Sequence, residues 1–152
     1  MEPSLSLVNY NWNESNKDGL ISCLKQTVCM ALDAFIKVGF IHGDLDCNNI
    51  LIKKSNENEI DYGFVKIRIN GYKSKLMDCK LSKINQDVKE FYKQMRFVFI
   101  SSIIRYVGPY SFINQSILDD IFIKVFEMWD NSQNKEDALW ILEIVDLLDK
   151  LI

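Results

Sequence analysis

The sequence lacks several residue patterns, and each absence excludes a class of function. The single histidine and the four cysteines, which form no Cys-x-x-Cys pair, argue against a zinc site. The net charge of −3 provides no basic field that would favour a nucleic-acid partner. No apolar run approaches the roughly 18–20 residues that span a bilayer, and the start, Met-Glu-Pro-Ser, does not resemble a signal peptide. We therefore expect an intracellular protein with free thiols and without a nucleic-acid or membrane partner.

The remaining composition is that of a globular domain. Hydrophobic residues make up 48% of the 152 residues, which is enough apolar surface for one core. No linker or repeat divides the chain. We expect a single domain over residues 1–152, in four stretches: an N-terminal segment (1–16), a helix (17–38), a loop and hairpin (40–78) and further helices (87–152).

The clearest helix signal covers residues 17–38. Six apolar side chains recur there at steps of three and four, which places them on one helical face. Asn16 or Ser15 can cap the start, and Gly39 stands where a left-handed C-terminal cap belongs. Three later helices are expected on the same grounds, with a break at Gly108-Pro109, over residues 87–104, 113–129 and 135–152.

Residues 40–78 have strand and turn patterns instead. Phe40-Ile41 and residues 50–52 predict short strands, and the polar residues 53–59 predict a surface turn. Residues 65–69 alternate apolar and polar side chains, and Asn70-Gly71 then favours a two-residue hairpin turn that leads into a returning strand. We expect a small β insertion over residues 60–77, and hence an α+β fold that is mostly helical.

One motif in this region carries chemistry. Residues 42–51 read HGDLDCNNIL, and Asp78 follows a second apolar strand. An Asp, an Asn five positions later and a further Asp after a strand are the parts of a phosphoryl-transfer site. In such a site Asp44 accepts the proton of the attacking hydroxyl, whereas Asn49 and Asp78 hold the metal ions that bridge the nucleotide phosphates.

The motif HGDLDCNNIL and the run KLMDCKLSK around Asp78 resemble the protein kinase superfamily. The resemblance covers only the C-terminal lobe of that family. The enlarged hairpin and the Asp-x-x-Leu-Ser-Lys run are similar to the atypical haspin group and to kinases of large DNA viruses. The resemblance implies ATP and magnesium as cofactors if the protein is active. It also implies that His42 packs against the backbone of the metal-binding segment, and that Asp87 opens a helix and bonds backbone amides of the catalytic loop.

The chain departs from the family at positions that matter for activity. Before residue 39 there is one glycine, Gly19, so no Gly-rich loop covers the phosphates, and no strand lysine can be assigned. Gly43 replaces an arginine, and Asp46 replaces a lysine. Only eight residues (79–86) separate Asp78 from Asp87, which is too few for a peptide-binding platform. These features predict a truncated kinase-like protein with weak or no phosphotransferase activity alone. An active kinase completed by a separate N-lobe, and a pseudokinase that binds a partner, remain alternatives.

The absent N-lobe also makes a structural prediction. Ile50, Ile52, Leu76 and Met77 would face it, so part of their surface should lie exposed and apolar. Either residues 5–12 fold back over these side chains, or the surface binds a protein partner. We favour partial cover by residues 5–12, because this stretch is apolar for a surface tail.

Overall fold

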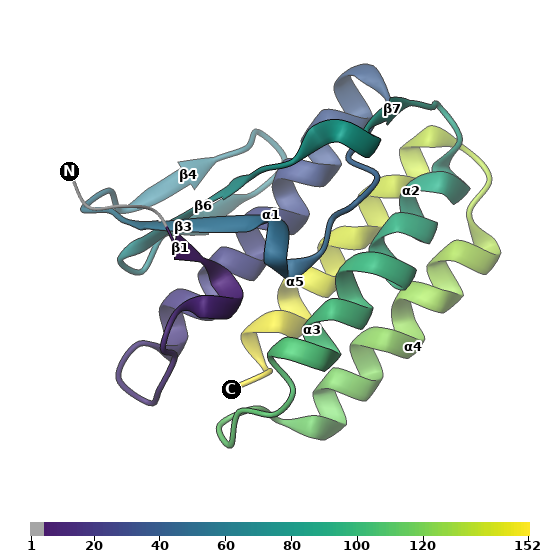
Figure 1. Cartoon of the computed structure of the whole chain (residues 1–152). Helices are drawn as coiled ribbons and strands as arrows, with labels where there is room; N and C mark the ends of the chain where they lie inside the picture. The colour runs from purple at the N-terminus through teal and green to yellow at the C-terminus, as the bar shows by residue number, and fades with distance from the viewer. Residues whose placement is uncertain (1–4) are drawn as a thin grey trace.

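The computed structural model describes residues 5–152, which adopt an α+β fold. Helix α1 (Lys17–Val38) separates a small β-sheet on one side from the other helices on the other side (Figure 1). The hydrophobic core is continuous across α1 and joins both layers. The small sheet is thereby joined to the helical layer through α1.

Helix α1 has the predicted bounds. Gly39 follows it at φ 71°, in the left-handed region, and its amide donates to the carbonyls of Ala34 and Phe35. Asn16 occupies the N-cap position, but its side chain bonds the backbone of Asn11 and Asn13 rather than the helix amides, so it orders the preceding loop instead. By length and composition α1 could cross a membrane, yet 72% of its most apolar stretch is buried in this fold.

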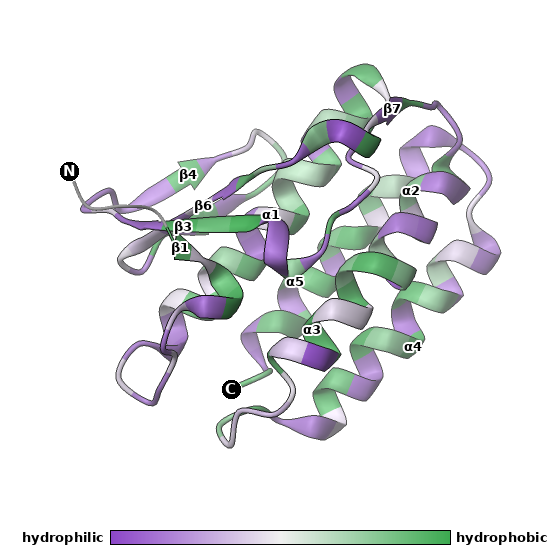
Figure 2. Cartoon of the chain, viewed as in Figure 1, coloured by the Kyte–Doolittle hydropathy of each residue, from purple (hydrophilic) through white to green (hydrophobic). Residues whose placement is uncertain are grey.

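The main sheet has the strand order β1-β3-β6, formed by Leu5–Ser6, Ile50–Lys54 and Tyr72–Leu76, all antiparallel. Ile50 and Ile52 point from β3 into the core (Figure 2 shows this strand hydrophobic at its first residues and hydrophilic at its last). Gln26 of α1 completes the edge of β6, because its amide donates to the carbonyl of Tyr72 and accepts from the amide of Ser74. A helix side chain thus takes the place of a fourth strand.

The pairing within residues 53–77 differs from the prediction. The turn at Asn70-Gly71 forms, with φ of 52° and 89°, but the strands on its two sides do not pair with each other. Strand β5 (Lys66–Arg68) pairs with β4 (Glu59–Asp61), whereas β6 pairs with β3. The expected surface turn at 53–59 is shorter, since its ends belong to β3 and β4. The predicted inward alternation of 65–69 is confirmed by Ile67 and Ile69, which are fully buried.

The helical layer follows a short ribbon of β2 (Phe40–Ile41) and β7 (Lys83–Ile84). The predicted helix 87–104 is continuous from residue 88 to 106, although six residues in its middle are π-helical: α2 (Val88–Gln94), a π segment (Met95–Ile100) and α3 (Ser101–Tyr106). After the break at Gly108-Pro109 come α4 (Gln115–Asn131), a 3₁₀ segment (Lys135–Ile141) and α5 (Leu142–Asp149).

The N-terminal segment covers the sheet, as expected. Strand β1 pairs with β3, Leu7 and Trp12 are buried, and the Trp12 indole donates to the Leu7 carbonyl at 3.0 Å. Tyr10 and Tyr72 join their hydroxyls at 2.8 Å. The expected exposed apolar surface is therefore absent at Ile50 and Ile52. Among the described residues, Met77, which was expected to be exposed, is 39% exposed, and further apolar exposure near the loop lies at Leu81 (64%) and Ile84 (66%).

Candidate functional site

The loop between β2 and β3 brings Asp44 and Asn49 together. The Asn49 side-chain amide donates to the Asp44 carbonyl at 2.8 Å and to one Asp44 carboxylate oxygen at 2.9 Å. Both side chains are half-buried. The amide orients the carboxylate, and it leaves the Asn49 side-chain oxygen free to face a cation.

His42 connects this loop to the segment that carries Asp78. The buried ring accepts the Asp44 amide at Nδ1 (3.2 Å), so the proton of the neutral ring belongs on Nε2, which donates to the Met77 carbonyl at 2.7 Å. His42 thus bonds the backbone of the residue before Asp78, in the contact that the resemblance implied.

Asp78 lies beside the loop rather than across the domain. The Met77 amide donates to the Asn49 carbonyl at 2.9 Å, so Asp78 is one residue from two points of contact with the loop, at His42 and Asn49. Its side chain is exposed, and its backbone is left-handed with φ 59°. Asn70 is the only other non-glycine residue with positive φ among residues 5–152. Such backbone conformations are often retained at functional positions.

Gly43 is required where these segments meet. It has φ 88°, and a Cβ atom there would overlap the backbone carbonyl of Leu81, in the 3₁₀ turn Cys79–Leu81 that follows Asp78. An arginine at position 43, which protein kinases usually have at the matching position, would place its Cβ against the same carbonyl. The glycine is therefore what allows the short segment after Asp78 to pack directly on the loop.

Two residues that sequence reasoning missed hold the loop from the helical layer. Gln94 accepts the Gly43 amide at 3.1 Å, and Ser102 accepts the Cys47 amide at 3.1 Å. Both are buried, on either side of the π segment. A polar residue on a helix face gives no sequence signal for a partner that lies about 50 residues away.

Asp87 does not have the expected contact with the catalytic loop. Its carboxylate accepts the Lys89 amide at 2.9 Å and caps α2. Among the described residues it makes no hydrogen bond to residues 42–49. Asp46 likewise has a local role, since it accepts the Asn48 amide and caps the 3₁₀ turn Cys47–Asn49.

The donor set suits a magnesium ion that is also bound by substrate. Mg²⁺ usually takes one or two protein carboxylates and completes its shell with water and phosphate oxygens. Asp78 and Asn49 offer a carboxylate and an amide oxygen, with the Asp44 carboxylate adjacent. No group of three or more His, Cys, Asp or Glu side chains in the described chain is placed to hold a metal without such help.

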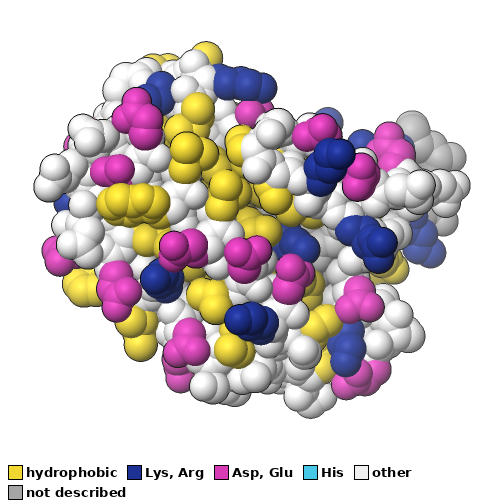
Figure 3. All heavy atoms as spheres, turned by 180° about the vertical axis from the view of Figure 1, so that it is seen from behind, with side chains coloured by type: hydrophobic (Ala, Val, Ile, Leu, Met, Phe, Trp, Pro, Cys, Tyr) yellow, Lys and Arg dark blue, Asp and Glu magenta, His cyan; other side chains and the backbone are white. Residues whose placement is uncertain are grey.

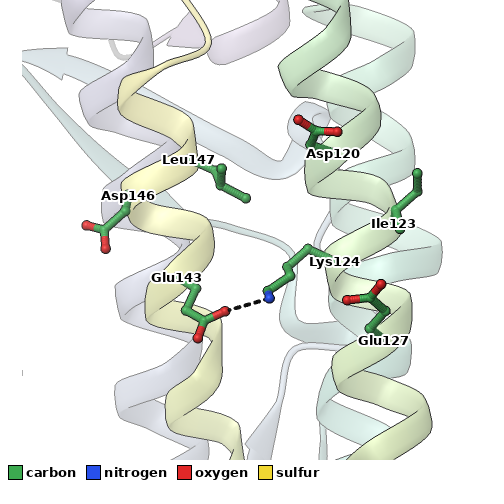
Figure 4. A pocket seen from close by; sticks show the side chains of 7 residues that line it. All are labelled: Asp120, Ile123, Lys124, Glu127, Glu143, Asp146 and Leu147. Atoms are coloured by element: carbon green, nitrogen blue, oxygen red, sulfur yellow. Dashed lines mark ion pairs between the residues drawn. The ribbon is translucent and has the colours of Figure 1, made fainter.

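A hollow lies between α4 and α5. Carboxylates and two aliphatic side chains line it, and Lys124 pairs with Glu143 across it at 3.1 Å (Figure 4). On the face opposite to that in Figure 1, acidic and hydrophobic side chains lie next to each other (Figure 3). None of the candidate catalytic residues lines the α4–α5 groove.

All four thiols are free, as expected. Burial raises the pKa of three of them, Cys23, Cys29 and Cys47, to about 12. Cys79 is exposed and directly follows Asp78. It therefore provides a chemical probe beside the candidate site.

No protein-family model matches the chain, and a search of curated proteins finds no match.

Proposed function

We propose that the chain is a truncated protein-kinase-like domain, related to Ser/Thr kinases and equivalent to the C-terminal lobe. Asp44 is the catalytic base, and Asn49 and Asp78 are the ligands of magnesium bound to ATP. The observation that carries the proposal is the bond from the Asn49 amide to the Asp44 carboxylate, within a loop that His42 ties to the residue before Asp78.

Further support comes from the backbone of Asp78. A left-handed conformation costs an aspartate on the order of 1 kcal/mol or more, and the surrounding contacts of Met77 and Leu81 hold it in place. Such a cost is readily explained where the conformation aims a carboxylate at a ligand.

The same site argues for weak activity or none in the isolated chain. Phosphoryl transfer depends on positioned charges, and removing one preorganised donor often costs ~10²–10³ in rate. Among residues 5–38 there is one glycine, Gly19, which lies in α1, and the one strand, β1, carries no lysine, so this part of the chain offers no glycine-rich loop or strand lysine to hold the phosphates. A separate N-lobe would have to supply these groups for efficient catalysis.

A role as a partner-binding pseudokinase is favoured by a different observation. Leu81 and Ile84 are 64% and 66% exposed, and both follow closely after Asp78. A protein that supplied the missing lobe, or that only bound here, would cover them. A pseudokinase role of this kind predicts that a partner protein binds equally well when Asp78 is substituted.

Thermal unfolding with and without ATP and magnesium tests the main proposal. A ligand that binds only the folded state stabilises it by RT ln(1 + [L]/Kd), which is about 1.4 kcal/mol at a ligand concentration ten times Kd. For a domain of this size that corresponds to a rise in Tm of about 3–6 °C. Asp78→Asn should abolish the rise and preserve the fold, because Asn also tolerates positive φ. A rise that persists unchanged in Asp78→Asn, or no rise with millimolar nucleotide, would contradict the proposal.

A further inference from the structure

The face of the main sheet that is turned away from α1 carries a concentration of lysines. The register of β3 and β6 places Lys53, Lys73 and Lys75 on this face, because side chains alternate along each strand. Together with Lys54, at the end of β3, they line a hollow of about 590 Å³, which we call the lysine face. In Figure 1 α1 passes behind this sheet, so the lysine face is directed toward the viewer. Ser55 also lines the hollow, whereas the Ser74 hydroxyl is directed to α1, where it donates to Gln26 at 3.4 Å.

The strand register brings the positive charges into direct opposition. Lys53 lies directly across from Lys73, and Lys75 is the diagonal neighbour of Lys53, at a distance of about 7–8 Å between Cα atoms. Like charges directly opposite each other destabilise a sheet. The fold therefore carries a local electrostatic cost that a bound anion would remove.

One carboxylate offsets part of this charge. Glu57 pairs with Lys73 at 2.5 Å, and the Lys73 ammonium lowers the pKa of the Glu57 carboxyl. In the described chain Lys53, Lys54 and Lys75 have no ion-pair partner. The hollow is thus strongly positive in a protein whose net charge is −3.

We propose that the lysine face binds a small, soluble, multiply phosphorylated anion. Lysine ammonium groups bind phosphate as point charges, and serine hydroxyls can donate to phosphate oxygens. The volume lies within the 300–1,000 Å³ typical of small-molecule sites. Among residues 5–152 no aromatic ring lines the hollow, so the described chain offers no platform for the base stacking that holds single-stranded nucleic acid.

This site does not depend on the phosphotransfer proposal. Asn49 directly precedes β3, and Lys53 lies four residues further along, which corresponds to about 13 Å of extended chain, so the two sites can be tested separately. The lysine face needs no metal ion, whereas the nucleotide site proposed above does. Binding to the lysine face should therefore survive both EDTA and Asp78→Asn.

Isothermal titration of the full chain with inositol hexakisphosphate, in EDTA, tests the proposal. We expect saturable binding that weakens with added salt. The double variant Lys53→Gln/Lys75→Gln should weaken binding by about tenfold or more, because it removes two of the facing charges. Glu57→Gln should strengthen it, because it releases Lys73.

The matched control is Lys93→Gln/Lys150→Gln, which removes the same net charge from two exposed lysines outside the hollow. Its affinity should stay within about twofold of the unmodified chain. The proposal is overturned by absence of saturable binding, by equal weakening in the control pair, or by loss of binding in Asp78→Asn. Binding confined to phosphoinositide vesicles, or to single-stranded DNA, would also overturn it.

Discussion

Gly43→Ala measures how closely the segment after Asp78 packs on the catalytic-type loop. The substitution forces alanine into φ 88°, which costs about 1–2 kcal/mol, and pushes its Cβ into the Leu81 carbonyl. That carbonyl must retreat by roughly 1 Å to restore ordinary contact, at a further cost of about 2 kcal/mol. The total of about 3–4 kcal/mol lowers Tm by roughly 6–16 °C in a domain of this size.

Gly63→Ala is the matched control. Gly63 has φ 91°, almost the same as Gly43, but a Cβ atom there would meet nothing within 4 Å. It therefore incurs the backbone cost alone, about 1–2 kcal/mol. Urea and thermal unfolding followed by circular dichroism give both values. Equal destabilisation by the two variants would refute the contact between Gly43 and Leu81, and with it the placement of Asp78 beside the loop.

Three further substitutions or reactions test other contacts. Trp12→Ala should lower the free energy of unfolding by about 3–5 kcal/mol in urea titrations, because the buried indole attaches the N-terminal cover; a loss below about 1 kcal/mol would mean that the cover is dispensable. Gln26→Met should cost about 1–3 kcal/mol, since it unpairs backbone groups of Tyr72 and Ser74 at the edge of β6, and an unchanged midpoint would contradict the edge role. At about pH 8 a thiol reagent should modify Cys79 alone in the native protein. The burial-raised pKa values keep the other three thiols protonated until the pH approaches 12, so a second rapid native thiol would count against their burial.

Local patterns in the sequence predicted the elements whose causes are local. Helix α1 has the expected bounds because its apolar repeat ends at Gly39, which supplies the left-handed cap. The turn at Asn70-Gly71 was also correct, since both residues accept positive φ. The predicted pairing of the two strands beside this turn was wrong, because strand pairing depends on burial against residues distant in sequence. Strand β6 pairs with β3, whose Ile50 and Ile52 are buried in the core, while β5 pairs with β4.

In the candidate site, too, the contacts between residues close in sequence were predicted, and those between distant residues were not. The spacing of His42, Asp44 and Asn49 predicted a shared loop, and the hydrogen bonds among them are present. Asp87 was assigned to that loop by resemblance, yet its carboxylate finds a nearer partner in the helix that it caps. Gln94 takes the contact with the loop instead, across 51 residues of sequence. No periodicity or motif connects a helix glutamine to a glycine at that distance.

Paramagnetic broadening of amide NMR signals by Mn²⁺ with ATP shows whether Asp44, Asn49 and Asp78 hold a metal–nucleotide complex, because broadening falls steeply with distance from the ion. We expect selective loss of signals from residues 42–49 and 76–79 in the unmodified chain, and retention of these signals in Asp78→Asn. Broadening centred on the acidic groove between α4 and α5, or loss of signal that Asp78→Asn leaves unchanged, would contradict this assignment.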